Sequence, residues 1–118
     1  MSVEAKLFSV LSPLFGGRVF PDDAPLDTQK PFATYQQIGG DVVGFLDQTV
    51  PSKQNGAFQI NVWADSRASA AAITLQVESA MILATQFQAS PIGGPIATRE
   101  QDLKLYGTVR DFDIWSDR

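Results

Sequence analysis

Two pairs of acidic residues have the spacing that metal binding or acid–base chemistry would need. Asp22 and Asp23 are adjacent in a proline-rich stretch, and neighbouring carboxylates could hold a hard cation. The stretch lacks the alternating ligands and turn glycine of a calcium loop, so we interpret the pair as solvated loop residues. Asp111 and Asp113 could share a strand face as paired acids. Because Arg110 and Arg118 are nearby in the sequence and offer charge pairing, we favour a structural or interface role for this second pair.

The composition removes most other chemistry. The 118 residues include no Cys and no His. A thiolate nucleophile, a disulfide and a Cys-based zinc site are therefore excluded, and the commonest general base is missing. The three Gly-Gly pairs match no phosphate-binding fingerprint, and we interpret them as turns. We expect no enzyme activity, no catalytic residues, no cofactor and no metal.

Charge and hydropathy restrict the partners. Nine Lys and Arg residues against thirteen Asp and Glu residues give a net charge of −4. This balance argues against specific nucleic-acid binding and against a polybasic membrane anchor. The apolar runs, such as 80–84, are far shorter than a membrane span, and residues 1–11 lack the form of a signal peptide. We expect no membrane partner and synthesis in a cytoplasm.

The N-terminal segment has the pattern of an amphipathic helix. Apolar residues recur at helical spacing from Val3 to Leu14, and Ser2 is placed to cap the first turn. Pro13 lacks a backbone N–H, which predicts that the regular helix ends near residues 11–12.

Three short strands are expected next. Residues 18–20 form the first, and the three prolines of 21–31 predict a loop after it. Residues 32–38 form the second strand. The Asn-Gly pair at 55–56 is a turn signal, and apolar residues then alternate strictly over 57–64, as a half-buried strand requires.

The connection at 41–54 is long for a hairpin and unusually apolar for a loop. It could form one extra strand that pairs locally. Alternatively, it is an arm whose apolar side chains are covered by a partner. The contact candidates in the arm are Val42, Val43, Phe45 and Leu46.

The main helix is expected over residues 67–86, with two apolar stripes on nearly opposite sides. The first stripe contains Ala70, Ile73, Val77, Ala80, Met81 and Ala84. The second contains Ala68, Ala72, Leu75 and Ile82. Narrow polar strips separate them, and one strip carries Arg67, Thr74, Glu78 and Thr85. A helix on a sheet needs only one apolar stripe, so the second meets another subunit or is packed internally.

The C-terminal part predicts one or two further strands. Residues 87–92 allow a short strand, and the Pro and Gly residues of 91–95 indicate a turn. The last strand is expected over 103–115. Its apolar residues change parity, which predicts a β-bulge near residues 110–111.

These elements predict a single α+β domain spanning residues 1–118. We expect an antiparallel or mixed sheet of four to five strands with two helices packed on one face. The order along the chain is α-β-β-β-α-β-β, and the long loop or arm at 41–54 interrupts it.

Four motifs in this order resemble a family of small tailed-phage and prophage proteins assigned to tail completion, or tail termination. They are the Arg-Val-Phe-Pro step at 18–21, Pro-Phe with Tyr-Gln at 31–36, Gln-x-x-Val-Trp-Ala at 59–64 leading into Arg67, and Phe-x-Ile-Trp at 112–115. The resemblance covers nearly the whole chain. It implies a non-enzymatic structural protein of the phage virion tail, assembled in the bacterial host cytoplasm.

The resemblance also implies partners. Similar proteins form a ring, commonly a hexamer, that caps the tail tube and offers the head–tail joining surface. The partners would be copies of this chain, the tail tube protein and the head–tail connector protein. The long connection, here 41–54, would contact the tube or a neighbouring subunit.

Two other functions remain open. A small α+β ligand-binding or dimeric interaction module, unrelated to phage, would show a concave pocket with convergent polar groups. A small hydrolase or isomerase using Asp and Lys would need buried carboxylates with raised pKa values in a cleft.

Overall fold

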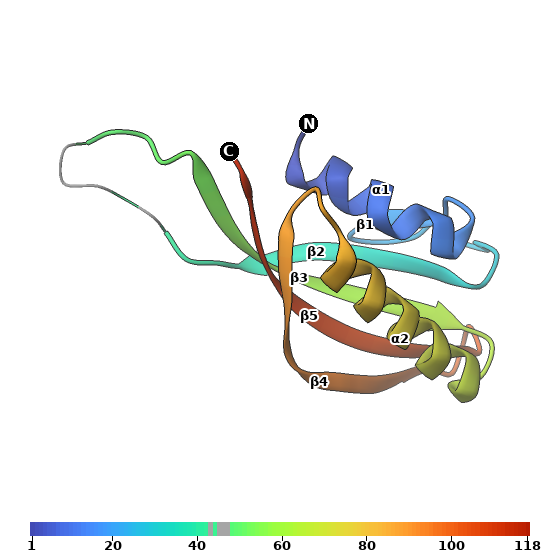
Figure 1. Cartoon of the computed structure of the whole chain (residues 1–118). Coiled ribbons are helices and arrows are strands. Elements are labelled where there is room, and N and C mark those ends of the chain that lie inside the picture. The colour runs from blue at the N-terminus through green and yellow to red at the C-terminus, as the bar shows by residue number, and fades with distance from the viewer. Residues whose placement is uncertain (43, 45–47) are drawn as a thin grey trace.

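The computed structural model describes residues 1–42, 44 and 48–118 and places two helices on one face of a five-stranded sheet (Figure 1). The elements are α1 (Val3–Phe15), β1 (Val19–Pro21), β2 (Phe32–Gly39), β3 (Lys53–Ala64), α2 (Arg67–Leu83), β4 (Gln88–Glu100) and β5 (Leu105–Asp117). The strand order is β1-β2-β3-β5-β4, with β1 parallel to β2 and all other pairs antiparallel. The expected α+β fold and element order are confirmed, and the sheet is mixed.

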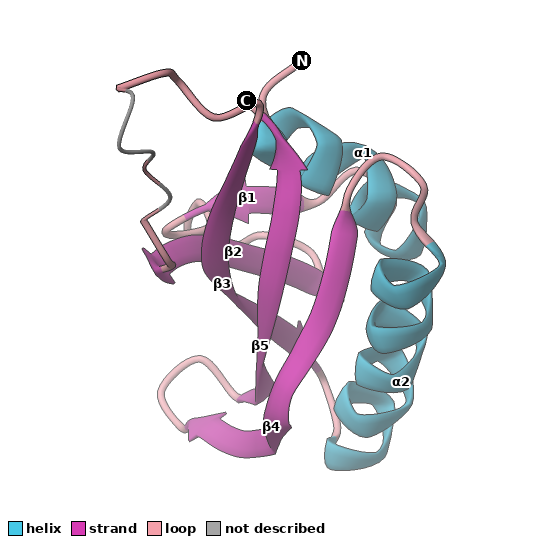
Figure 2. Ribbon diagram, turned by 60° about the vertical axis from the view of Figure 1, so that its left-hand side comes forward, coloured by secondary structure: helices cyan, strands magenta, loops and turns pink. Residues whose placement is uncertain are grey.

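The core lies between the sheet and the two helices, which Figure 2 shows on the same side. On β3, Phe58, Ile60 and Val62 are buried and alternate with half-exposed residues. Helix α1 adds Leu7, Leu11 and Phe15, and α2 adds Ala70, Val77 and Met81. We call the side of the sheet that these residues cover the helix face, and the opposite side the outer face.

Helix α1 extends past Pro13 to Phe15, so the predicted end at residues 11–12 is wrong. The fully buried Phe15 stabilises the last turn against the core, which offsets the hydrogen bond that the proline lacks. Gly16 ends the helix in the left-handed conformation and donates its N–H to the Ser12 carbonyl. The predicted cap is confirmed, since Ser2 accepts from the Ala5 N–H at 3.1 Å.

The turn predicted at Asn55-Gly56 is also wrong, because β3 begins four residues earlier than 57. Asn55 pairs with Trp115 of β5, and its side-chain amide donates to Asp113 Oδ1 at 2.7 Å. This cross-strand hydrogen bond holds the Asn-Gly pair in the ladder. Lys53 and Gln54, which the sequence assigns to the arm, therefore belong to the strand.

The Gly-Gly-Pro segment at 93–95 does not end a strand. It interrupts the pairing of β4 with β5 between Ile92 and Ile96, while β4 continues to Glu100. The irregularity lies opposite Arg110, whose side chain donates to the Gly93 carbonyl. An edge strand tolerates proline and an unpaired residue, since one side of its backbone needs no partner.

The predicted β-bulge near 110–111 is absent from β5, which pairs with β3 in one unbroken register. The change in parity of the apolar residues along β5 therefore has another cause. Leu105 is buried on the outer face beneath the β1–β2 loop, whereas Phe112 and Ile114 are buried on the helix face. On the helix face β5 is buried from Thr108 to Ser116, and near its start Leu105 is buried on the outer face as well.

Candidate interaction surfaces

Helix α2 leaves an apolar surface open to solvent. Ala68, Ala72, Leu75 and Ile82, which we call the α2 surface, are all exposed. The exposed fractions reach 67% for Leu75 and 52% for Ile82. The predicted second stripe is therefore not covered by α1 or by the sheet.

The buried side of α2 includes part of a polar strip. Thr74 is buried, and its hydroxyl donates to the Ala70 carbonyl at 2.7 Å. Glu78 accepts from Arg110 of β5 at 3.1 Å. The helix is rotated so that this polar strip faces the sheet. Its hydrogen bonds are satisfied within the helix or by β5, so the strip can lie against the core.

A second apolar surface belongs to the connection between β2 and β3. Its described parts lead away from the helices and the sheet (Figures 1 and 2). Val42 is 99% exposed and Val50 is 74% exposed. Val43, Phe45 and Leu46, the other arm candidates, lie outside the described residues.

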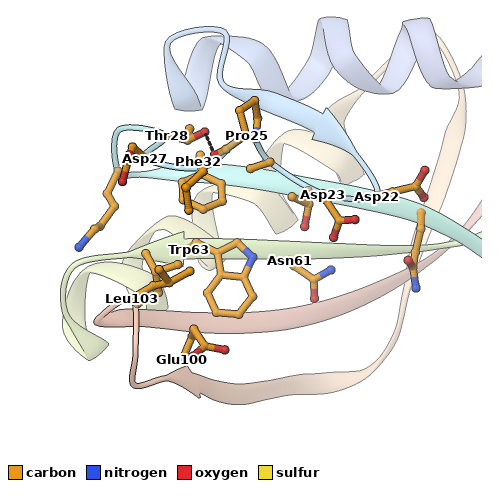
Figure 3. A pocket seen from close by; sticks show the side chains of 16 residues that line it. Asp22, Asp23, Pro25, Asp27, Thr28, Phe32, Asn61, Trp63, Glu100 and Leu103 are labelled. Atoms are coloured by element: carbon orange, nitrogen blue, oxygen red, sulfur yellow. Dashed lines mark hydrogen bonds between the residues drawn. The ribbon is translucent and has the colours of Figure 1, made fainter.

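A hollow of about 760 Å³ lies on the outer face, and no residue pattern in the sequence indicates it. The β1–β2 loop forms one wall, and the turn between β4 and β5 forms the other. Phe32 and Trp63 belong to its floor on β2 and β3 (Figure 3), and Thr34 of β2 also lines the hollow. Lys30 of the loop donates to the Lys104 carbonyl of the turn at 3.4 Å, so the two walls are connected.

The rim of this outer-face hollow is acidic. Asp22, Asp23, Asp27 and Glu100 line it, against a single cation, Lys30. In residues 1–42, 44 and 48–118, the ion pairs join Lys53 to Asp117 and Arg110 to Glu78. All four rim carboxylates therefore lack an ion-pair partner within the described part of the chain.

The second acidic pair lies elsewhere on the outer face. Because β5 is unbroken, Asp111 and Asp113 share that face two residues apart. Asp113 accepts from Asn55 at 2.7 Å, and Asp111 Oδ1 is buried with no hydrogen-bond partner among the described residues. Among those residues, no group of three acidic side chains is placed to hold a metal ion.

Among the described residues, two titratable groups have shifted pKa values. Burial raises the pKa of the Tyr35 phenol, and the nearby carboxylates of Glu4 and Asp22 raise it further. The hydrogen bond from Lys53 lowers the pKa of the Asp117 carboxyl. Neither change places a general base near neutral pH. No helix in the described part of the chain is long and apolar enough to cross a membrane.

The fold is shared with solved structures. A chain from the virion of a native gene transfer agent particle superposes with a TM-score of 0.63, covering 99% of this chain and 96% of that one at 17% identity. A second solved chain superposes with a TM-score of 0.57, over 98% of this chain and 93% of the other at 12% identity. No curated protein sequence matches significantly. At these identities the likeness establishes the fold.

The family model for tail completion protein gp17 matches residues 6–117. The fold described above is thus that of a structural component of a phage tail. This chain belongs to the tail completion protein gp17 family. The resemblance stated from the four sequence motifs is confirmed.

Proposed function

We propose that this protein caps the phage tail tube as an oligomeric ring, a hexamer in the assembled particle, and provides the head–tail joining surface. The main support for this proposal is that one subunit exposes two separate apolar surfaces, the α2 surface and the arm. Both views place them on different sides of the domain (Figures 1 and 2). A ring built from head-to-tail contacts needs two different surfaces on each subunit.

The α2 surface is suited to a contact between neighbouring subunits. Its two small residues, Ala68 and Ala72, permit close approach, and Leu75 and Ile82 supply apolar area to bury. Exposed apolar side chains grouped on one helix face are typical of a surface covered in an assembly.

The arm supplies the second contact in this proposal, toward the tail tube protein or the next subunit. The two ends of the arm are fixed, because β2 pairs with β3 up to Gly39 and Arg118 donates its N–H to the Ser52 carbonyl. A fixed base presents the residues beyond it at a defined place on the ring. The opposite side of the ring would meet the head–tail connector protein, and assembly takes place in the host cytoplasm.

Native mass spectrometry over a range of concentrations tests this function. A discrete species near six times 12.8 kDa, alone or on addition of tail tube protein, is expected. A tight dimer at every concentration would overturn the ring. A monomer that tail tube protein fails to recruit would overturn both the ring and the tube partner.

A further inference from the structure

The outer-face hollow is not used by the α2 surface or by the arm. It lies on the other side of the sheet from α2, between the β1–β2 loop and the end of β4 (Figure 3). The hydrogen bond from Lys30 to the Lys104 carbonyl holds its two walls together at one end. Its volume of about 760 Å³ is in the range of sites that bind small molecules or peptide side chains.

Several features of the hollow favour a cationic occupant. The carboxylates of Asp23, Asp27 and Glu100 line the same hollow as the indole of Trp63 (Figure 3). None of them has an ion-pair partner among the described residues. An indole ring beside unpaired carboxylates suits a Lys or Arg side chain, which the ring attracts through a cation–π contact.

A hydroxyl of the lining offers a ligand a hydrogen bond. Thr34 lines the hollow with only 6% of its surface exposed. Its side chain makes no hydrogen bond within the described part of the chain. The exposed part of Thr34 includes its hydroxyl, which is not one of the buried unpartnered groups, and an incoming backbone N–H or carbonyl could form a hydrogen bond with it in the hollow.

We propose that the outer-face hollow binds a basic, partly apolar peptide segment of another protein. The carboxylates of Asp22, Asp23, Asp27 and Glu100 receive its Lys or Arg side chains. Trp63 and Leu103 contact its apolar residues, and Thr34 bonds to its backbone. We take the protein that carries this peptide to be another component of the virion, and only this choice rests on the proposed function.

Two other occupants fit the hollow less well. The rim carboxylates belong to no three-residue cluster that could hold a metal ion, so they suit separate charges along a peptide better than one divalent cation. A second copy of this chain has few free cations to offer. The side chains of Arg18, Lys30, Lys53, Arg67, Arg99 and Arg110 already donate to groups within their own subunit.

The test uses the whole protein and a blocked pentapeptide, Gly-Arg-Leu-Lys-Gly, with Gly-Glu-Leu-Glu-Gly as the acidic control. Nitrogen-15 NMR follows the two indole N–H signals, because Trp63 lies in the hollow and Trp115 lies at the far end of the sheet. The basic peptide is expected to shift the Trp63 signal in a saturable way and to leave the Trp115 signal in place.

A matched pair of variants then tests the rim. Asp23→Asn with Asp27→Asn removes two rim charges, and asparagine tolerates the left-handed backbone of residue 27. Asp41→Asn with Asp65→Asn removes two charges that are also exposed but do not line the hollow. The rim variant should raise the Kd for the basic peptide about three- to tenfold, as loss of one or two surface charge pairs predicts, and the control variant less than twofold.

Three results would overturn the proposal. One is an unmoved Trp63 signal at millimolar basic peptide. Another is an equal response to the acidic peptide, or equal Kd changes in the two variants. The third is a Trp63 shift that magnesium chloride alone reproduces at millimolar concentration, which would make the hollow a cation site. None of these measurements depends on the ring mass, so failure here is distinct from failure of the proposed function.

Discussion

Arg110 Nη2 donates to Glu78 Oε2 at 3.1 Å and thereby joins β5 to α2 beneath the helix. Only 6% of the Arg110 surface is exposed, and the same guanidinium donates to the Gly93 carbonyl at the irregularity of β4. One buried cation therefore connects three elements. A charge buried this deeply is tolerated only while its hydrogen bonds persist.

Glu78→Ala should destabilise the fold by about 2 kcal/mol, because it leaves the Arg110 charge buried with one partner fewer. Thermal unfolding of the variant should show a melting temperature lower by several degrees. Gln76→Ala, on the exposed side of the same helix, should change stability by less than about 0.5 kcal/mol. Equal effects of the two substitutions would show that the ion pair does not stabilise the fold.

The α2 surface can be tested without disturbing the core. Leu75→Gln with Ile82→Gln should abolish the ring in native mass spectrometry, because it removes the apolar area that neighbouring subunits would bury. The melting temperature of the monomer should change little, since both side chains are exposed. Leu83→Gln is the control, being 77% exposed and about 80° around the helix from Leu75. A ring that survives the double substitution argues against this contact.

Gly107→Ala should destabilise the fold by about 1–3 kcal/mol through overpacking. An added Cβ would lie 2.5 Å from Thr98 Oγ1 and 2.6 Å from Trp63 Cζ3. Gly94→Ala is the control, because a Cβ there meets nothing within 4 Å and the backbone is not left-handed. Denaturant unfolding compares the two. If both variants unfold at the same midpoint, the close packing at residue 107 is not as described.

Tyr35 makes stability sensitive to alkaline pH. Burial raises its pKa in the folded state, so the unfolded chain ionises first as the pH rises through about 10. The stability that this group contributes is complete below the unfolded pKa and is lost as the pH rises toward the folded pKa. Tyr35→Phe should therefore lose less stability than the parent protein between about pH 9.5 and 11 in urea unfolding. An equal loss of stability in the variant and the parent protein over this pH range would contradict the raised pKa of Tyr35.

Much of the fold was predictable because its signals are local. The strand at 57–64 was predicted from the strict alternation of its apolar residues, which reflects the two-residue period of a strand. The Ser2 cap was predictable because a serine just before a helix can accept from an unsatisfied N–H group of the first turn. The second apolar stripe of the main helix followed from residue spacing in the same way, and its residues are exposed.

The wrong predictions, and the features that the sequence did not indicate, lie where elements distant along the chain meet. The Asn-Gly turn signal gave way to a hydrogen bond from Asn55 to Asp113, 58 residues further along the chain. Thr74 and Glu78 are polar, yet they face the core because the Ala70 carbonyl and Arg110 satisfy them. The hollow combines residues of the β1–β2 loop with Trp63 and Glu100, and spacing along the chain gives no sign of that combination.

The element order, the α+β class and the lack of His and Cys chemistry could be inferred without a structure, because they depend on residue type and on short periods. The sequence also carried the ordered motifs by which the family is recognised. The folded chain was needed to see which apolar residues stay exposed, how far α1 continues past Pro13, and where carboxylates without an ion-pair partner lie together. Those outcomes depend on burial and on long-range pairing, whose free energies can exceed local propensity.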